Sequence, residues 1–210
     1  MFNLNNLIVM KDHVVLIVGA SGGIGAATAQ VFADAGARLV LAARDEDKAQ
    51  LTAQQINANN GQARALGVDV TDLASVSAMG RDIEENEGRI DVLVNAFGRG
   101  LIKPLQDINP RTAKEVMDVN VYGTFLVTQT IMRYMETAGQ GRVIMFPGIL
   151  GKAVMKNTSV YSATKFAITG FTKALTEEQR KGQVKFSLMY LGGVGTPFWD
   201  DDNVDMKVKK

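Results

Sequence analysis

The sequence contains no cysteine, only 4 prolines, one histidine and one tryptophan. The lack of cysteine excludes disulfide bonds and thiolate metal sites, and it is typical of proteins of the reducing cytoplasm. A net charge of +1 provides no excess of basic side chains for nucleic acid or for an anionic membrane. No apolar run approaches the roughly 18 residues of a membrane span. We therefore expect a cytoplasmic protein with no nucleic-acid partner, no membrane span and no metal.

The chain is long enough for one domain with a sizeable core, because 46% of its 210 residues are hydrophobic. No repeat, low-complexity stretch or linker divides it, so residues 1–210 are expected to form a single nucleotide-binding domain. The first residues lack the basic and apolar regions of a signal peptide. Because Met10 would serve equally well as a start, residues 1–11 are expected to be an N-terminal extension.

Apolar runs alternate with helical patterns along the whole chain. The apolar runs predict strands at residues 13–18, 38–43, 63–68, 90–95, 142–146 and 184–190. The helical patterns lie at residues 26–35, 46–58, 71–87, 110–138 (with interruptions) and 158–181. Strands that are apolar throughout and separated by helices predict an α/β fold, a Rossmann-type doubly wound parallel sheet with helices on both faces. Such a sheet binds its ligands at the carboxyl ends of its strands.

The loop after the first strand reads VGASGGIG and contains Gly19, Gly23 and Gly25. Glycines allow a tight turn and a close approach of the backbone, and the helix that follows offers free N–H groups to a pyrophosphate. The alternative is a glycine-rich turn without a ligand. Its position between a strand and a helix near the N-terminus favours a nucleotide.

This spacing resembles the T-G-x-x-x-G-x-G motif of the short-chain dehydrogenase/reductase family, with Val18 in place of the threonine. The family's N-N-A-G and P-G-x-V-x-T motifs recur in part, as Asn95 to Gly98 and as Leu191 to Thr196. The resemblance covers about residues 12–200. It implies cofactor contacts at Gly19, Ser21, Gly23, Ile24, Gly25, Asp69, Val70, Asn95, Gly98, Tyr161, Lys165, Val194 and Thr196. For Asp69 the alternative is that it caps the next helix together with Thr71.

The loop after the second strand bears on the choice of cofactor. A carboxylate at the strand end would favour NAD, but Ala43 stands there and Arg44 follows. A guanidinium at this point can bind a 2′-phosphate, so NADP(H) is favoured over NAD(H). Two alternatives remain: Arg44 pairs with a neighbouring carboxylate, or Asp45 binds the ribose.

Tyr161 and Lys165 stand one helical turn apart and match the family's catalytic pair. Reduction of a carbonyl by hydride requires a proton, and a free tyrosine with a pKa near about 10 is a poor donor and acceptor at neutral pH. We expect the lysine ammonium, with the positive ring of the oxidised cofactor, to lower that pKa. The resemblance also assigns Asn120 to a water relay that links the lysine to solvent.

Gly148 occupies the place of the family's catalytic serine, 13 residues before the tyrosine. Loss of one preorganised donor typically costs about 10²–10³ in rate. The backbone N–H of Gly148 or Ile149, a water, or the hydroxyl of Ser159 are possible substitutes between which the sequence does not choose.

Two functions are therefore open: an NADP(H)-dependent oxidoreductase acting on a carbonyl or alcohol substrate, or an NADP(H)-binding sensor or partner subunit with little turnover. The departures that favour the second are Val18, Ala96-Phe97, Gly148 and Leu191. Phe198, Trp199 and Met155 come from segments expected to cover the substrate, which favours an apolar pocket. The resemblance also implies a homodimer or homotetramer, and a fold whose C-terminal end is short in this chain.

Overall fold

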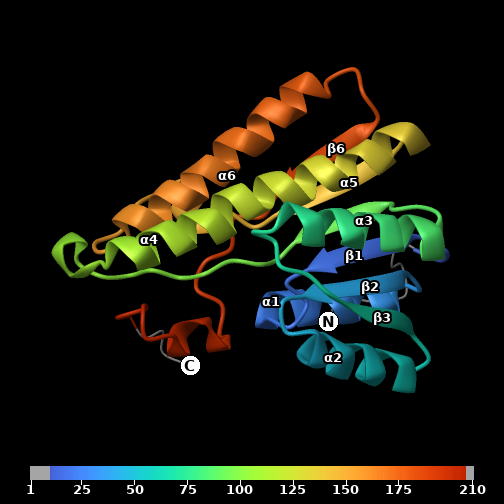
Figure 1. The fold of residues 1–210 in the computed structure, drawn as a ribbon, viewed down its shortest axis with the longest axis horizontal. Coiled ribbons are helices and arrows are strands. Elements are labelled where there is room, and N and C mark those ends of the chain that lie inside the picture. Colours follow the sequence, from blue (N-terminus) through green and yellow to red (C-terminus); the bar gives the residue numbers. More distant parts are fainter. Residues whose placement is uncertain (1–9, 207–210) are drawn as a thin grey trace, which may run out of the picture.

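The computed structural model describes residues 10–206, so the expected N-terminal extension lies outside the described residues except for its last two positions. Six parallel strands form one sheet, as the sequence predicts, and their order is β3-β2-β1-β4-β5-β6 (Figure 1). The strands are β1 (Val14–Val18), β2 (Arg38–Ala43), β3 (Gln62–Gly67), β4 (Val92–Asn95), β5 (Gly141–Met145) and β6 (Val184–Leu188). Strand order reverses direction between β1 and β4, which is where a doubly wound sheet opens a crevice.

Helices cover both faces of the sheet, with α1 and α2 on one side and α3, α5 and α6 on the other (Figure 1). The helices are α1 (Gly23–Asp34), α2 (Glu46–Ala58), α3 (Leu73–Glu87), α4 (Pro110–Met117), α5 (Thr124–Ala138) and α6 (Ser159–Glu178). Short 3₁₀ turns are η2 (Leu105–Asp107), η4 (Ile149–Gly151) and η5 (Pro197–Asp200). No helix within residues 10–206 is both long and apolar enough to cross a membrane.

The alternation of side chains along β1 divides the core in two. Val14 and Leu16 pack with α3, α5 and α6, whereas Val15 and Ile17 pack with α1 and α2. All four side chains are fully buried. Because successive residues of a strand point to opposite faces, a strand that is covered twice must be apolar at every position. That requirement explains why the apolar runs in the sequence predicted the sheet.

Many element boundaries shift by one to three residues from expectation, and two differences bear on the site. α1 begins at Gly23, three residues earlier than expected, because the helix starts inside the glycine-rich turn. The long helical pattern at 110–138 is broken by a π-helical segment, η3 (Asp118–Gly123), between α4 and α5. Such segments frequently mark functional sites, and this one contains Asn120.

Candidate active site

The glycine-rich turn requires glycine at two of its positions, Gly19 and Gly25. Gly19 has φ +91°, and a Cβ there would lie 2.5 Å from the backbone nitrogen of Phe97. A Cβ on Gly25 would overlap the carbonyl oxygen of Gly19. Gly22, the N-cap of α1, provides no capping side chain, and the first turn contains no acidic residue. The turn therefore leaves helix N–H groups available to an anionic group, which suits a pyrophosphate.

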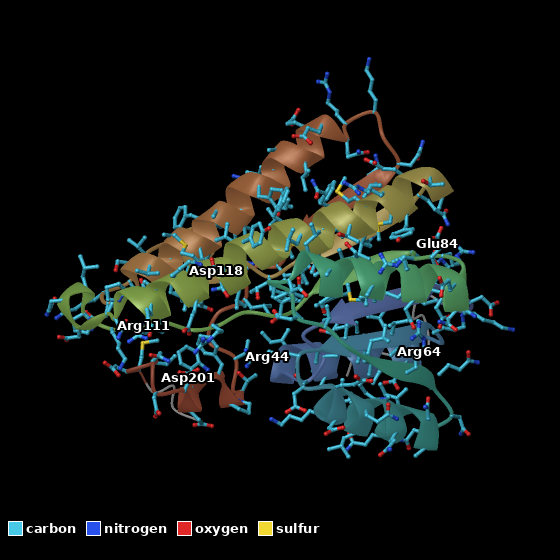
Figure 2. All side chains as sticks on the ribbon, viewed as in Figure 1. Arg44, Arg64, Glu84, Arg111, Asp118 and Asp201 are labelled. Atoms are coloured by element: carbon cyan, nitrogen blue, oxygen red, sulfur yellow. The ribbon has the colours of Figure 1, made fainter. Side chains whose placement is uncertain are left out.

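The structure distinguishes Arg44 from Asp45, the two residues after β2 that the sequence suggests for contact with the ribose or its 2′-phosphate. Asp45 is the N-cap of α2: its carboxylate accepts the Lys48 N–H at 3.2 Å and pairs with the Lys48 ammonium at 3.0 Å. These bonds, chiefly that to the Lys48 side chain, hold the pKa of Asp45 below its ordinary value. Arg44 is exposed and forms no hydrogen bond or ion pair with the described residues. In the view of Figure 2, Arg44 lies between Asp201 of the C-terminal segment and Arg64.

The residues predicted after β3 and β4 have mainly structural contacts. Asp69 accepts the N–H and the hydroxyl of Thr71 at 2.9 and 2.7 Å, while the cap of α3 is Asp72 and not Thr71. Asn95 points into the core, where its Nδ2 donates to Thr128 Oγ1 at 3.1 Å. A cofactor contact at Asn95 would therefore come from its backbone. Val70 packs against Gly123 of η3.

Asn120 joins three segments of the site. Its Oδ1 accepts the N–H of Arg99 at 2.7 Å, and its Nδ2 donates to the Arg99 carbonyl at 3.0 Å and to Thr164 Oγ1 at 3.1 Å. A Cβ on Gly98 would lie 3.2 Å from Asn120 Oδ1 and 3.7 Å from Lys165 Nζ. Asn120 thus holds the loop after β4 against α6, beside the lysine.

Tyr161 and Lys165 lie on the first turns of α6, with Lys165 Nζ 5.3 Å from the centre of the tyrosine ring. Lys165 is buried, and its Nζ donates to the carbonyl of Phe146 at 3.1 Å. Burial lowers the pKa of Lys165 to about 8, so the ammonium persists at neutral pH and is lost above that value. Burial also raises the pKa of Tyr161. In the protein alone, the lysine does not produce the lowered tyrosine pKa that the sequence led us to expect, because desolvation of the phenolate dominates.

A cavity of about 460 Å³ brings many of these groups together. Among the predicted site residues, those that line it are Ile24, Gly98, Tyr161, Lys165, Val194 and Thr196. Those outside its lining are Gly19, Ser21, Gly23, Gly25, Arg44, Asp69, Val70, Asn95 and Asn120. The second set lies in the turn after β1, in the loops after β2 and β3, at the end of β4 and in η3. The cavity itself is where a reacting centre would lie beside the tyrosine.

Comparison with known proteins assigns this arrangement to a family. The sequence model described as short chain dehydrogenase matches residues 13–207. The chain belongs to the short-chain dehydrogenase family. An uncharacterized oxidoreductase of Staphylococcus epidermidis is 33% identical over 188 residues, which cover 90% of this chain and 80% of the relative.

Solved short-chain dehydrogenases share the fold. A metagenomic short-chain oxidoreductase in complex with NADP matches with a TM-score of 0.83 and 32% identity, over 89% of this chain and 85% of that one. A short-chain dehydrogenase/reductase from Burkholderia phymatum in complex with NAD matches with a TM-score of 0.89 and 26% identity, over 99% and 73%. These similarities confirm the Rossmann-type fold that the sequence predicted.

Gly148 gives the loop after β5 of this short-chain dehydrogenase a residue with positive φ. Its backbone has φ +64° and ψ −179°, a region that is essentially restricted to glycine. Its N–H donates to Met189 O at 3.3 Å, and the N–H of Ile149 donates to Leu191 O at 2.8 Å. Ser159 is exposed and lines a separate hollow. Both backbone donors considered from the sequence are therefore engaged, and Ser159 does not line the cavity.

Sequence reasoning missed part of the cavity wall. Ile102 and Met206 line the cavity, and Ile102 forms a parallel β-bridge with Val204. Residues 200–210 have only a weak pattern, and a bridge of single residues leaves no periodicity for a sequence to reveal. The expectation that Phe198, Trp199 and Met155 lie near the substrate site agrees with their places in the lining of this short-chain dehydrogenase.

Proposed function

We propose that this chain is an NADP(H)-dependent oxidoreductase that transfers hydride between the nicotinamide and a carbonyl or alcohol substrate. The observation that carries the proposal is the placement of Tyr161 and the buried Lys165 on one cavity. That cavity also reaches Ile24, in the first turn of α1 beside the glycine-rich turn. A proton donor thus lies next to a candidate nucleotide site.

The residues present fit a nicotinamide dinucleotide. Side chains at Gly19 and Gly25 would fill the turn, and the start of α1 offers N–H groups without a competing carboxylate. Val194 and Thr196 line the cavity that would receive the nicotinamide end. The bound cofactor would supply or accept the hydride.

The protein's own contribution is to the proton. The Tyr161 hydroxyl would give its proton to the substrate oxygen as the alcohol forms, and take it back in the reverse direction. Lys165, held by its bond to the Phe146 carbonyl, provides a positive charge that favours the phenolate. Asn120 keeps the loop after β4 in place beside that lysine.

Arg44 supports the choice of NADP(H) over NAD(H), because Asp45 is committed to capping α2. Replacement of Arg44 by alanine is expected to raise the Kd for NADP⁺ by about 10- to 100-fold, the equivalent of one charged hydrogen bond. The Kd for NAD⁺ should change little. Titration calorimetry with both cofactors measures this, and Arg111→Ala, an exposed arginine at the start of α4, is the control. Equal losses for both cofactors in Arg44→Ala would contradict the assignment.

The alternative is an NADP(H)-binding sensor or partner subunit without turnover. The engaged N–H groups of Gly148 and Ile149 favour it, because they leave no protein donor for the substrate oxygen at this loop. The two functions predict the same cofactor affinity and different turnover.

The experiment that tests the proposal follows NADPH oxidation with ketones, aldehydes, quinones and β-ketoacyl thioesters, for the native protein beside Gly148→Ser. The serine should raise kcat by up to about 10²–10³-fold by providing a hydrogen-bond donor.

The Gly148→Ser change should also lower the free energy of unfolding by about 1–3 kcal/mol, because φ at this residue is positive. Gly139→Ser is the control, since Gly139 has φ +71° and open space around it. Cofactor binding without turnover in either protein would favour the sensor.

We also propose that the molecule is a cytoplasmic homodimer or homotetramer. Apolar side chains on α4, η3, α5 and α6 support this, because Met117, Tyr122, Phe125 and Phe166 are 38–47% exposed. Sedimentation analysis of the full chain measures the oligomeric state.

A further inference from the structure

The C-terminal segment 197–206 forms an outer wall of the cavity. It is fastened to the loop after β4 by two backbone bonds: Ile102 N–H to Asn203 O at 2.8 Å and Asp205 N–H to Ile102 O at 3.0 Å. Val204 is buried at 6% exposure, and Lys103 lies 3.8 Å from Asp205. The segment therefore has a defined seat on the domain.

Phe198 is the side chain that this segment presents to Tyr161. Their ring centres are 5.7 Å apart, and the ring of Trp199 lies edge-on to Phe198 at 5.1 Å. The Trp199 Nε1 donates to the carbonyl of Val194 at 2.7 Å, which fixes the pair. Gly100 leaves room for the Phe198 ring, because a Cβ there would lie 2.6 Å from Phe198 Cζ. Phe198 thus packs between Trp199 and Gly100, beside the proposed proton donor.

The wall around this point is apolar. Besides Phe198 and Trp199, it includes Met155, Leu150 and Ile102, and among the described residues that line the cavity Lys165 is the one charged side chain. Lys165 is already bonded to the Phe146 carbonyl. Among the described residues, a carboxylate or phosphate on the substrate would therefore find Lys165 as its only cation and would lose most of its water in an apolar site, which is costly.

Resting on the proposed function, we propose that Phe198 is the specificity-determining residue that limits the size of the substrate, and that the substrate is a compact, uncharged carbonyl compound. Ile24, Val194 and Thr196 belong to the proposed cofactor end of the same cavity of about 460 Å³. The substrate is left with the part beside Tyr161. Phe198 closes that part, so a bulky group opposite the carbonyl meets its ring.

The test uses Trp199, the only tryptophan of the chain, as a fluorescent reporter beside the cavity. Cyclohexanone, 4-tert-butylcyclohexanone and 4-oxocyclohexanecarboxylate are titrated in the presence of NADP⁺, and the midpoint of the emission change gives each Kd. These ketones share the ring carbonyl and differ in size or charge at the far end. The native protein should bind cyclohexanone at least about 10-fold more tightly than either other ketone, as expected for one steric or desolvation conflict of about 1.4 kcal/mol or more.

Phe198→Ala should bring the affinities for the two uncharged ketones to within about 2-fold while the carboxylate remains weak. Phe198→Leu, which keeps an apolar side chain on the segment, should give an intermediate ratio and guards against misfolding of the alanine variant. Leu105→Ala, at an exposed residue that lines the separate hollow, should keep the native ratio. An unchanged ratio in folded Phe198→Ala and Phe198→Leu, or tight binding of the carboxylate, would overturn the inference.

Turnover of the same ketones with NADPH separates this inference from the proposed function. Discrimination in binding without turnover would reject catalysis and keep the role of Phe198. Turnover that disappears in Tyr161→Phe, with a size preference that Phe198→Ala leaves unchanged, would reject the role of Phe198 alone. Failure of the native protein to bind any of the three ketones would reject the inference.

Discussion

Tyr161→Phe is expected to lower kcat by about 10³-fold, within the range that a positioned proton donor contributes. The change removes one hydroxyl and keeps the ring that packs against Phe198. The fold and the Kd for NADPH should therefore stay close to native values. Stopped-flow and steady-state absorbance with the best substrate of the carbonyl panel measure kcat, and fluorescence titration measures the Kd.

Tyr122→Phe is the matched control for this loss. Tyr122 lies in η3 and is 47% exposed, so removal of its hydroxyl makes the same chemical change on the surface. Its kcat should equal that of the native protein. If Tyr161→Phe retained native turnover, the proton would have to come from elsewhere, and the mechanism proposed for this site would fail.

Gly19→Ala is expected to lower the free energy of unfolding by about 2–6 kcal/mol. The backbone strain of a side chain at φ +91° contributes about 1–3 kcal/mol. Displacement of the Phe97 backbone, which a Cβ would approach to 2.5 Å, adds about 1–3 kcal/mol. Urea unfolding measures the change, and the nucleotide affinity should fall with it, because the turn that would carry the pyrophosphate is distorted.

Gly88→Ala is the control that measures the backbone-angle part of this loss alone. The difference between the two variants then gives the steric part. Gly88 ends α3 with φ +71°, and a Cβ there would meet nothing within 4 Å. The variant should lose only about 1–2 kcal/mol, the cost of left-handed backbone. Equal losses in both variants would mean that contact with Phe97 contributes nothing and that Gly19 is required for its backbone angle alone.

Local patterns predicted the sheet and the helices with few errors. The expected bounds of β2 and α2 agree with the structure, because a doubly covered strand is apolar throughout and α2 starts at an aspartate cap. The start of α1 was expected at residue 26, since glycine has low helix propensity and conceals the first turn. The π-helical segment around Asn120 was also missed, because its extra residue leaves the surrounding apolar pattern helical.

Part of the cavity lining was predictable from the sequence, but its contacts were not. Tyr161 and Lys165 stand at helical spacing, so their proximity followed from the sequence. The sequence left open whether the N–H groups of Gly148 and Ile149 were available. Only the structure places them on carbonyls after β6, more than 40 residues away in the chain. Likewise, burial that raises the pKa of Tyr161 arises from segments distant in sequence.

The sequence by itself determined the alternation of strands and helices, the glycine-rich turn and which loops follow the strands at the carboxyl edge of the sheet. These depend on residue type and short spacing, which act within one element. Only the tertiary structure decided that Asn120 binds Arg99 and that the ring of Phe198 packs beside Tyr161 in the cavity lining. Both contacts join segments that meet solely because the whole chain has folded, and no local periodicity encodes them.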